Sequence, residues 1–138
     1  MKKSRFPNNE VLIVGLIFIV FFLLIEVVLR MYNAYYHFPE VDIPSHIFAG
    51  MAILIAVYWI LSVNRVKSKI IFSIFYTFII AIVWEIIETL QELVIDNPPH
   101  LRDIFFWDGF FDIIFTIVGG LFGLVFLYIL RRITNLKI

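Results

Sequence analysis

The stretch from Ile104 to Leu130, IFFWDGFFDIIFTIVGGLFGLVFLYIL, decides the fold class of this chain. Its only charged side chains are Asp108 and Asp112. A helix that crosses the hydrocarbon core of a bilayer needs about 20 predominantly apolar residues. Barrel strands alternate apolar and polar residues, and this continuous apolar run does not. The stretch therefore predicts a membrane-spanning helix.

Three further segments have the same character, and the composition agrees with them. Of 138 residues, 62% are hydrophobic and only 16% are charged, whereas soluble domains carry about 25% charged residues. We expect an all-α, polytopic membrane protein, a four-helix transmembrane bundle in a single membrane domain (residues 1–138). The expected spans are Val11–Arg30, Ile43–Val63, Ile70–Val94 and Ile104–Leu130.

The basic residues predict the orientation of these spans. Nine of the eleven lysine and arginine residues fall before the first span, between the second and third, or after the fourth. Because basic loops stay on the cytoplasmic side, both termini are expected in the cytoplasm and the protein in the cell membrane, with multiple passes. The acidic residues mostly fall toward the opposite side, among them Glu26 in the first span. A polar cluster near the outer leaflet follows.

The second span begins with an acid and a histidine. Asp42 and His46 are four residues apart, so they share one face of a helix. Asp42 could simply cap the helix in front of Pro44. Alternatively, Asp42 orients His46, which then acts as a metal ligand or a proton carrier.

The third span ends in its densest polar stretch. Glu85 and Glu88 fall on one helix face, and like charges so close must protonate, pair or bind a cation. Glu85 lies deepest, between apolar neighbours, and we expect it with Glu88 in the site. Gln91 follows on the same turn as a candidate binding residue.

The fourth span adds three polar residues in steps of four: Asp108, Asp112 and Thr116. Small residues at a spacing of four allow close helix approach, which assigns a packing role to the glycines beyond them. These packing glycines are Gly119, Gly120 and Gly123.

Several chemistries can be weighed from these residues. Cysteine is absent, which removes thiolate ligands and nucleophiles, and no basic stripe indicates a nucleic-acid partner. The cofactor is unknown, but His46 with Glu85, Glu88 and Asp112 could bind a divalent metal ion. Arg102 could contact an anionic ligand group or pair with an acid.

The order of these motifs resembles a known family. Asp42-x-x-x-His46-x-x-x-Gly50, Glu85-x-x-Glu88 and Trp107-Asp108-x-x-x-Asp112 are similar to the YjdF-like inner-membrane proteins of bacteria and archaea. Glu88-x-x-Gln91 and Asp112-x-x-x-Thr116-x-x-Gly119-Gly120 are similar, more distantly, to VanZ-like proteins linked to glycopeptide-antibiotic resistance, with Thr116 where their pattern has Asn. The resemblance implies a membrane fold and location but no settled activity.

Three functions remain open from the sequence. In the first, the outward-facing site binds or acts on a lipid or cell-envelope molecule, with catalytic roles for His46, Glu85, Glu88 and Asp112. Asp42, Gln91, Arg102, Asp108 and Thr116 would then be binding residues. The second is a small oligomeric transporter coupled to ions or protons, and the third a non-catalytic accessory subunit in the lipid bilayer.

Overall fold

A computed structural model describes residues 9–32, 42–95 and 102–134 of the chain. At the helix ends it leaves out the side chains of residues 9, 30, 92–95, 102–106, 131, 133 and 134. Asp96, His100 and residues 33–41 therefore lie outside the described residues.

The described chain forms four α-helices and contains no strand within those residues. All four are long and apolar enough to cross a membrane. The prediction of an all-α, four-helix membrane protein is confirmed. The helices are α1 (Asn9–Met31), α3 (Ile43–Val63), α4 (Lys69–Ile95) and α5 (Arg102–Thr134).

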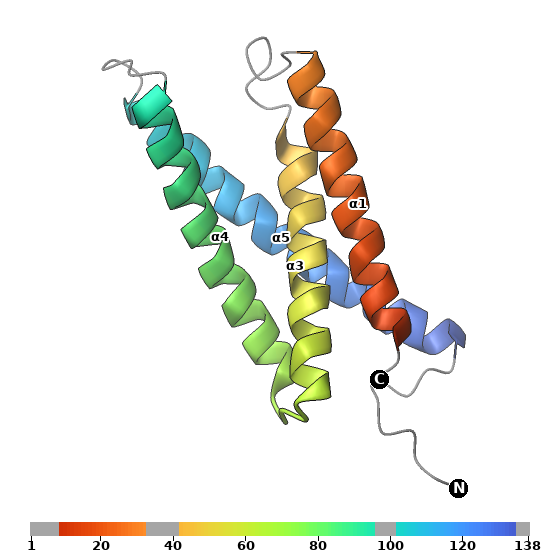
Figure 1. The fold of residues 1–138 in the computed structure, drawn as a ribbon. Coiled ribbons are helices and arrows are strands. Elements are labelled where there is room, and N and C mark those ends of the chain that lie inside the picture. The colour runs from red at the N-terminus through yellow and green to blue at the C-terminus, as the bar shows by residue number, and fades with distance from the viewer. Residues whose placement is uncertain (1–8, 33–41, 96–101, 135–138) are drawn as a thin grey trace, which may run out of the picture.

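Helix α3 is the centre of the bundle and packs against the other three helices. Figure 1 shows α1 and α4 on opposite sides of α3, with α5 crossing it obliquely. At one end of the bundle α1 and α4 end while α3 and α5 begin. We call this the acidic end, because the carboxylates described below lie there. Large apolar side chains such as Leu24 and Phe122 are exposed on the outside, as lipid-facing residues should be.

The crossing of α3 and α5 depends on glycines that leave no room for a side chain. A Cβ added to Gly50 would overlap the carbonyl oxygen of Thr116, and one added to Gly119 would overlap that of Ile47. One added to Gly123 would lie 3.2 Å from the Met51 carbonyl oxygen. The two backbones therefore touch directly, which brings the first half of α3 against the middle of α5.

The ends of α3 follow from local chemistry. Pro44 lies in the first turn, where its missing N–H leaves no hydrogen bond unmade. At the other end Arg65 adopts a positive φ of 57°. The Val66 N–H donates to the Leu61 carbonyl oxygen over 3.0 Å, and the Arg65 N–H donates to that of Ser62 over 3.2 Å. This Schellman motif ends α3 and turns the chain into α4.

We predict that Gly119→Ala destabilises the bundle by about 1–3 kcal/mol, the usual cost of overpacking a tight contact. The added methyl group would meet the backbone of Ile47, which can move only if the helices separate. Heat-induced unfolding in detergent, followed by circular dichroism, measures the effect.

Gly120→Ala is the matched control. Its added Cβ would lie 3.2 Å from Cδ1 of Leu54, the far end of a flexible side chain. Both variants gain the same intrinsic helix propensity. Equal losses of stability in the two variants would contradict a direct backbone contact between α3 and α5 at Gly119.

Candidate functional site

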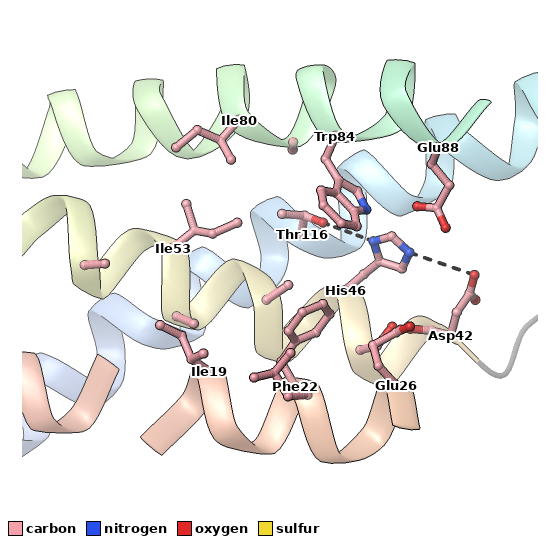
Figure 2. A pocket seen from close by; sticks show the side chains of 16 residues that line it. Ile19, Phe22, Glu26, Asp42, His46, Ile53, Ile80, Trp84, Glu88 and Thr116 are labelled. Carbon is pink, nitrogen blue, oxygen red and sulfur yellow. Dashed lines mark hydrogen bonds and ion pairs between the residues drawn. The ribbon is translucent and has the colours of Figure 1, made fainter. Parts of the chain in front are cut away.

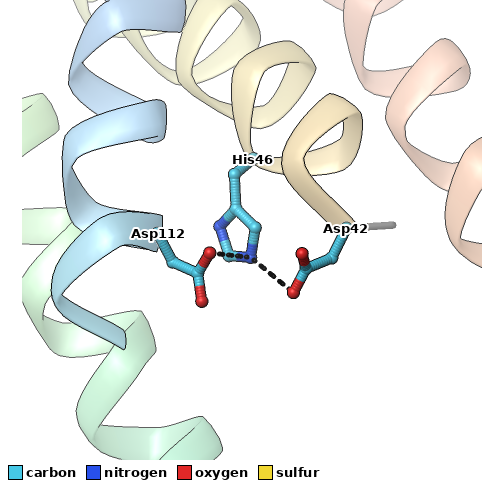
Figure 3. Close-up of side chains that lie close together, drawn as sticks. All are labelled: Asp42, His46 and Asp112. Atoms are coloured by element: carbon cyan, nitrogen blue, oxygen red, sulfur yellow. Dashed lines mark ion pairs between the residues drawn. The ribbon is translucent and has the colours of Figure 1, made fainter. Parts of the chain in front are cut away.

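His46 lies at the acidic end, where residues from three helices surround it. Its side chain is buried, with 8% of the residue exposed. Nε2 of His46 lies 3.6 Å from Oδ1 of Asp112 on α5 and 3.9 Å from Oδ2 of Asp42 at the start of α3. Figure 3 shows the imidazole between these two carboxylates, with Nε2 turned toward both.

The other ring nitrogen faces a second pair of groups. Nδ1 of His46 lies 3.8 Å from Oε1 of Glu85 on α4 and 3.4 Å from Oγ1 of Thr116 on α5. Hydrogen bonds between nitrogen and oxygen normally measure 2.7–3.2 Å. The three carboxylates therefore surround the ring without making tight hydrogen bonds to it. We call Asp42, His46, Glu85, Asp112 and Thr116 the histidine centre.

Helix spacing and one glycine place these side chains. Asp112 and Thr116 are four residues apart, so both face α3 where the glycine contact brings the helices together. A Cβ on Gly109 would lie 3.3 Å from Oε2 of Glu85, so this glycine lets the Glu85 carboxylate approach α5 closely. Sequence reasoning did not assign Gly109 to the site, although it lies one turn before Asp112.

Asp42 does not act as a side-chain cap of α3. It occupies the N-cap position, but its carboxylate makes no capping hydrogen bond. Instead its backbone carbonyl oxygen accepts a hydrogen bond of 2.7 Å from Oγ of Ser45, and its carboxylate faces His46. Burial, followed by the nearby charge of Asp108, raises the pKa of Asp42 to about 6. Of the two roles considered for Asp42, the geometry favours orientation of His46.

A pocket of about 320 Å³ adjoins the histidine centre. It lies over α3, between α1 and α4, and Figure 2 shows polar side chains at one end and apolar ones at the other. Leu23 and Trp84 line it and are also about half exposed on the outside of the bundle, so its walls border the lipid. The polar end contains Glu26, Asp42, His46 and Glu88, and the apolar end Ile19, Ile53 and Ile80.

The remaining predicted site residues are spread around this centre. Glu88 is half-buried and lines the pocket, whereas Asp108 and Gln91 are exposed. The side chain of Arg102 lies outside the described residues. Glu26 lines the pocket although we did not assign it to the site. Its depth in the first span, on the same side as the other acids, was the signal that could have identified it.

Comparison with known proteins gives a family but no characterised relative. The family model described as "Predicted membrane protein (DUF2238)" matches residues 2–133. No curated protein and no solved structure matches the chain.

We predict that Asp42→Ala does not destabilise the metal-free protein at pH 7. Loss of a true N-cap would cost about 1 kcal/mol, but Asp42 makes no such bond. The pKa of Asp42 rises from 3.8 to about 6 on folding, so the folded state holds this proton more tightly than the unfolded state does. Wild-type stability should therefore fall as pH rises through this window, and the variant should escape that loss.

The test is the unfolding midpoint of both proteins in detergent with a chelator. The variant should be the more stable protein at pH 7 and lose this advantage below pH 3.8, where the carboxyl is neutral in both states. A loss of stability that is the same at every pH would indicate a capping role and contradict the prediction.

Proposed function

This chain belongs to the DUF2238 family of predicted membrane proteins, and from that premise we propose that it binds a lipid or another amphiphilic cell-envelope molecule. The polar head of the ligand would lie at the histidine centre and its apolar part along the pocket. We also propose that the chain is related to the YjdF-like proteins and, more distantly, to the VanZ-like proteins.

The amphiphilic character of the pocket is the observation that carries the proposal. Binding pockets for small molecules usually measure about 300–1,000 Å³ and combine apolar walls with a few converging polar groups. Here the pocket is about 320 Å³, with isoleucines at one end and His46 among carboxylates at the other. A molecule with a hydrogen-bonding head and an apolar chain matches both ends.

The roles proposed for individual residues follow from their positions. While no metal ion occupies a ring nitrogen, His46 could accept a proton from a hydroxyl of the ligand head, because a neutral imidazole has a free lone pair on one nitrogen. Asp112 and Glu85 would stabilise the resulting imidazolium, and Glu88 would contact the ligand from α4. Asp108, Gln91 and Arg102 would act at the entrance, near the start of α5 and the end of α4.

Location in the cell membrane with both termini in the cytoplasm is also proposed. The described basic side chains lie at the end of the bundle opposite the histidine centre, as cytoplasmic groups should. They are Arg65, Lys67, Lys69 and Arg132. The site would then be reached from the outer leaflet, where cell-envelope molecules are found.

Two buried hydroxyl groups away from the acidic end, those of Ser73 and Thr77, are hydrogen-bonded within their own helix and so do not form a transport path. This favours binding over ion or proton transport. A transport path needs polar groups throughout the membrane. The hydroxyl of Ser73 donates to the Lys69 carbonyl oxygen over 2.7 Å, and that of Thr77 donates to the Ser73 carbonyl oxygen over 2.8 Å. Both hydroxyl protons are thus already donated to the backbone of α4. A purely structural accessory role would not require the pocket.

We predict that Ala56→Phe, which fills the apolar part of the pocket, reduces the lipid that copurifies with the protein about tenfold, equivalent to about 1.4 kcal/mol of binding free energy. Protein purified in mild detergent would be extracted and its lipid measured by mass spectrometry.

Val20→Phe provides a matched control, because it introduces the same phenylalanine side chain at a residue that is 54% exposed on the outside of α1. It should retain the wild-type lipid content. If Ala56→Phe keeps as much lipid as Val20→Phe, the pocket is not the binding site and the proposal fails.

A further inference from the structure

The histidine centre contains a buried carboxylate that no described donor satisfies. The Asp112 side chain is nine-tenths buried and points at His46. Its nearest charged partner, Nε2 of His46, lies 3.6 Å away, and among residues 9–32, 42–95 and 102–134 no hydrogen bond reaches it. Leaving such a group without a partner is costly, so a ligand that offers positive charge at this point is expected.

The charges around His46 also point to a cation. Asp42, Glu85 and Asp112 each approach one ring nitrogen, whereas the imidazole can offer at most one positive charge. The Lys and Arg side chains that the structure describes lie toward the opposite end of the bundle, whereas those of Arg30 and Arg102, at the acidic end, are not described. Buried like charges repel one another and lose their hydration. A bound divalent ion would offset both costs.

We propose that Asp42, Nε2 of His46 and Asp112 bind one divalent transition-metal ion. Their ligand atoms lie within 4.8 Å of one another. With metal–ligand distances of ~2.1 Å, neighbouring ligands of a tetrahedral ion are ~3.4 Å apart. The observed separations of 3.6 and 3.9 Å exceed this by a few tenths of an ångström, which small side-chain rotations remove. One nitrogen and two oxygen ligands suit Mn²⁺, Fe²⁺, Co²⁺ or Zn²⁺.

The surroundings of the other ring nitrogen fit this assignment. A histidine that binds a metal through one nitrogen usually donates its second N–H to a carboxylate or another acceptor, which fixes the ring orientation. Nδ1 of His46 faces the Glu85 carboxylate at 3.8 Å and the Thr116 hydroxyl at 3.4 Å. Glu85 and Thr116 are therefore positioning residues, and Nε2 is the ligand atom.

The remaining coordination positions would face the pocket. Three protein ligands leave at least one position of the ion open, as in catalytic rather than structural sites. Asp42 and His46 both line the pocket as well as the proposed metal site, so an oxygen atom of a pocket ligand could reach the ion. The metal site itself does not depend on what occupies the pocket.

The test uses the full-length protein, stripped with a chelator and titrated with Zn²⁺ or Co²⁺ in detergent. Wild type should bind one ion per chain, and Co²⁺ should give a visible absorption band. Asp112→Asn and His46→Gln should each weaken binding by at least about tenfold. Glu10→Gln is the control, since it removes an exposed acid in the first turn of α1, at the end of the bundle opposite the proposed ligands. It should bind like wild type.

Two results would overturn the proposal. In the first, wild-type protein binds no more metal than the Asp112→Asn variant and no more than the His46→Gln variant. Both variants must be verified as folded by circular dichroism. The second is loss of the ion in Glu88→Gln but not in Asp112→Asn, which would assign it to the alternative group His46, Glu85 and Glu88. Lipid content is measured in the same samples, so that a failure of the metal proposal (no bound ion) can be told from a failure of the lipid proposal (no bound lipid).

Discussion

The direct contact between the backbones of α3 and α5 is the constraint on which the site depends. Gly50 and Gly119 each lie against a carbonyl oxygen of the other helix, where no Cβ fits. The carbonyl oxygen that Gly50 meets is that of Thr116, and His46 precedes Gly50 by four residues, so His46 lies about one turn from the contact. Asp112 lies one turn before Thr116 on the other helix. Larger residues would push the helices apart, and Asp112 could then no longer approach His46 as closely.

This constraint explains why costly groups can lie within membrane-spanning helices. A buried carboxylate in hydrocarbon is unfavourable unless neighbouring groups or ions compensate it. The glycine contact turns Asp112 toward α3, and Gly109 allows Glu85 to approach from α4. The carboxylates thus face one another and the imidazole instead of lipid. Their mutual repulsion makes a bound cation favourable at the point where they converge.

Much of this arrangement could be predicted from the sequence, because it depends on local spacing. Apolar length gave the four helices, and steps of four placed Asp42 with His46 and Asp112 with Thr116. Tertiary information was needed for the rest. The choice between a capping and an orienting role for Asp42 depends on where α5 lies. The contribution of Glu26 depends on the packing of α1 beside α3, and no spacing along one helix indicates which ring nitrogen faces which acid.

The shared residues of the pocket and the histidine centre connect the two proposals physically. Asp42, His46 and Thr116 belong to both, whereas Asp112 and Glu85 contact His46 without lining the pocket. An ion at Nε2 would therefore lie between the buried acids and the head of a bound amphiphile. With no ion, the carboxylates would repel an anionic head such as a phosphate and favour one that donates hydrogen bonds. With a divalent ion, the net charge becomes less negative and an oxygen of an anionic head could complete the coordination. The metal content of the centre would then determine which class of lipid the pocket accepts.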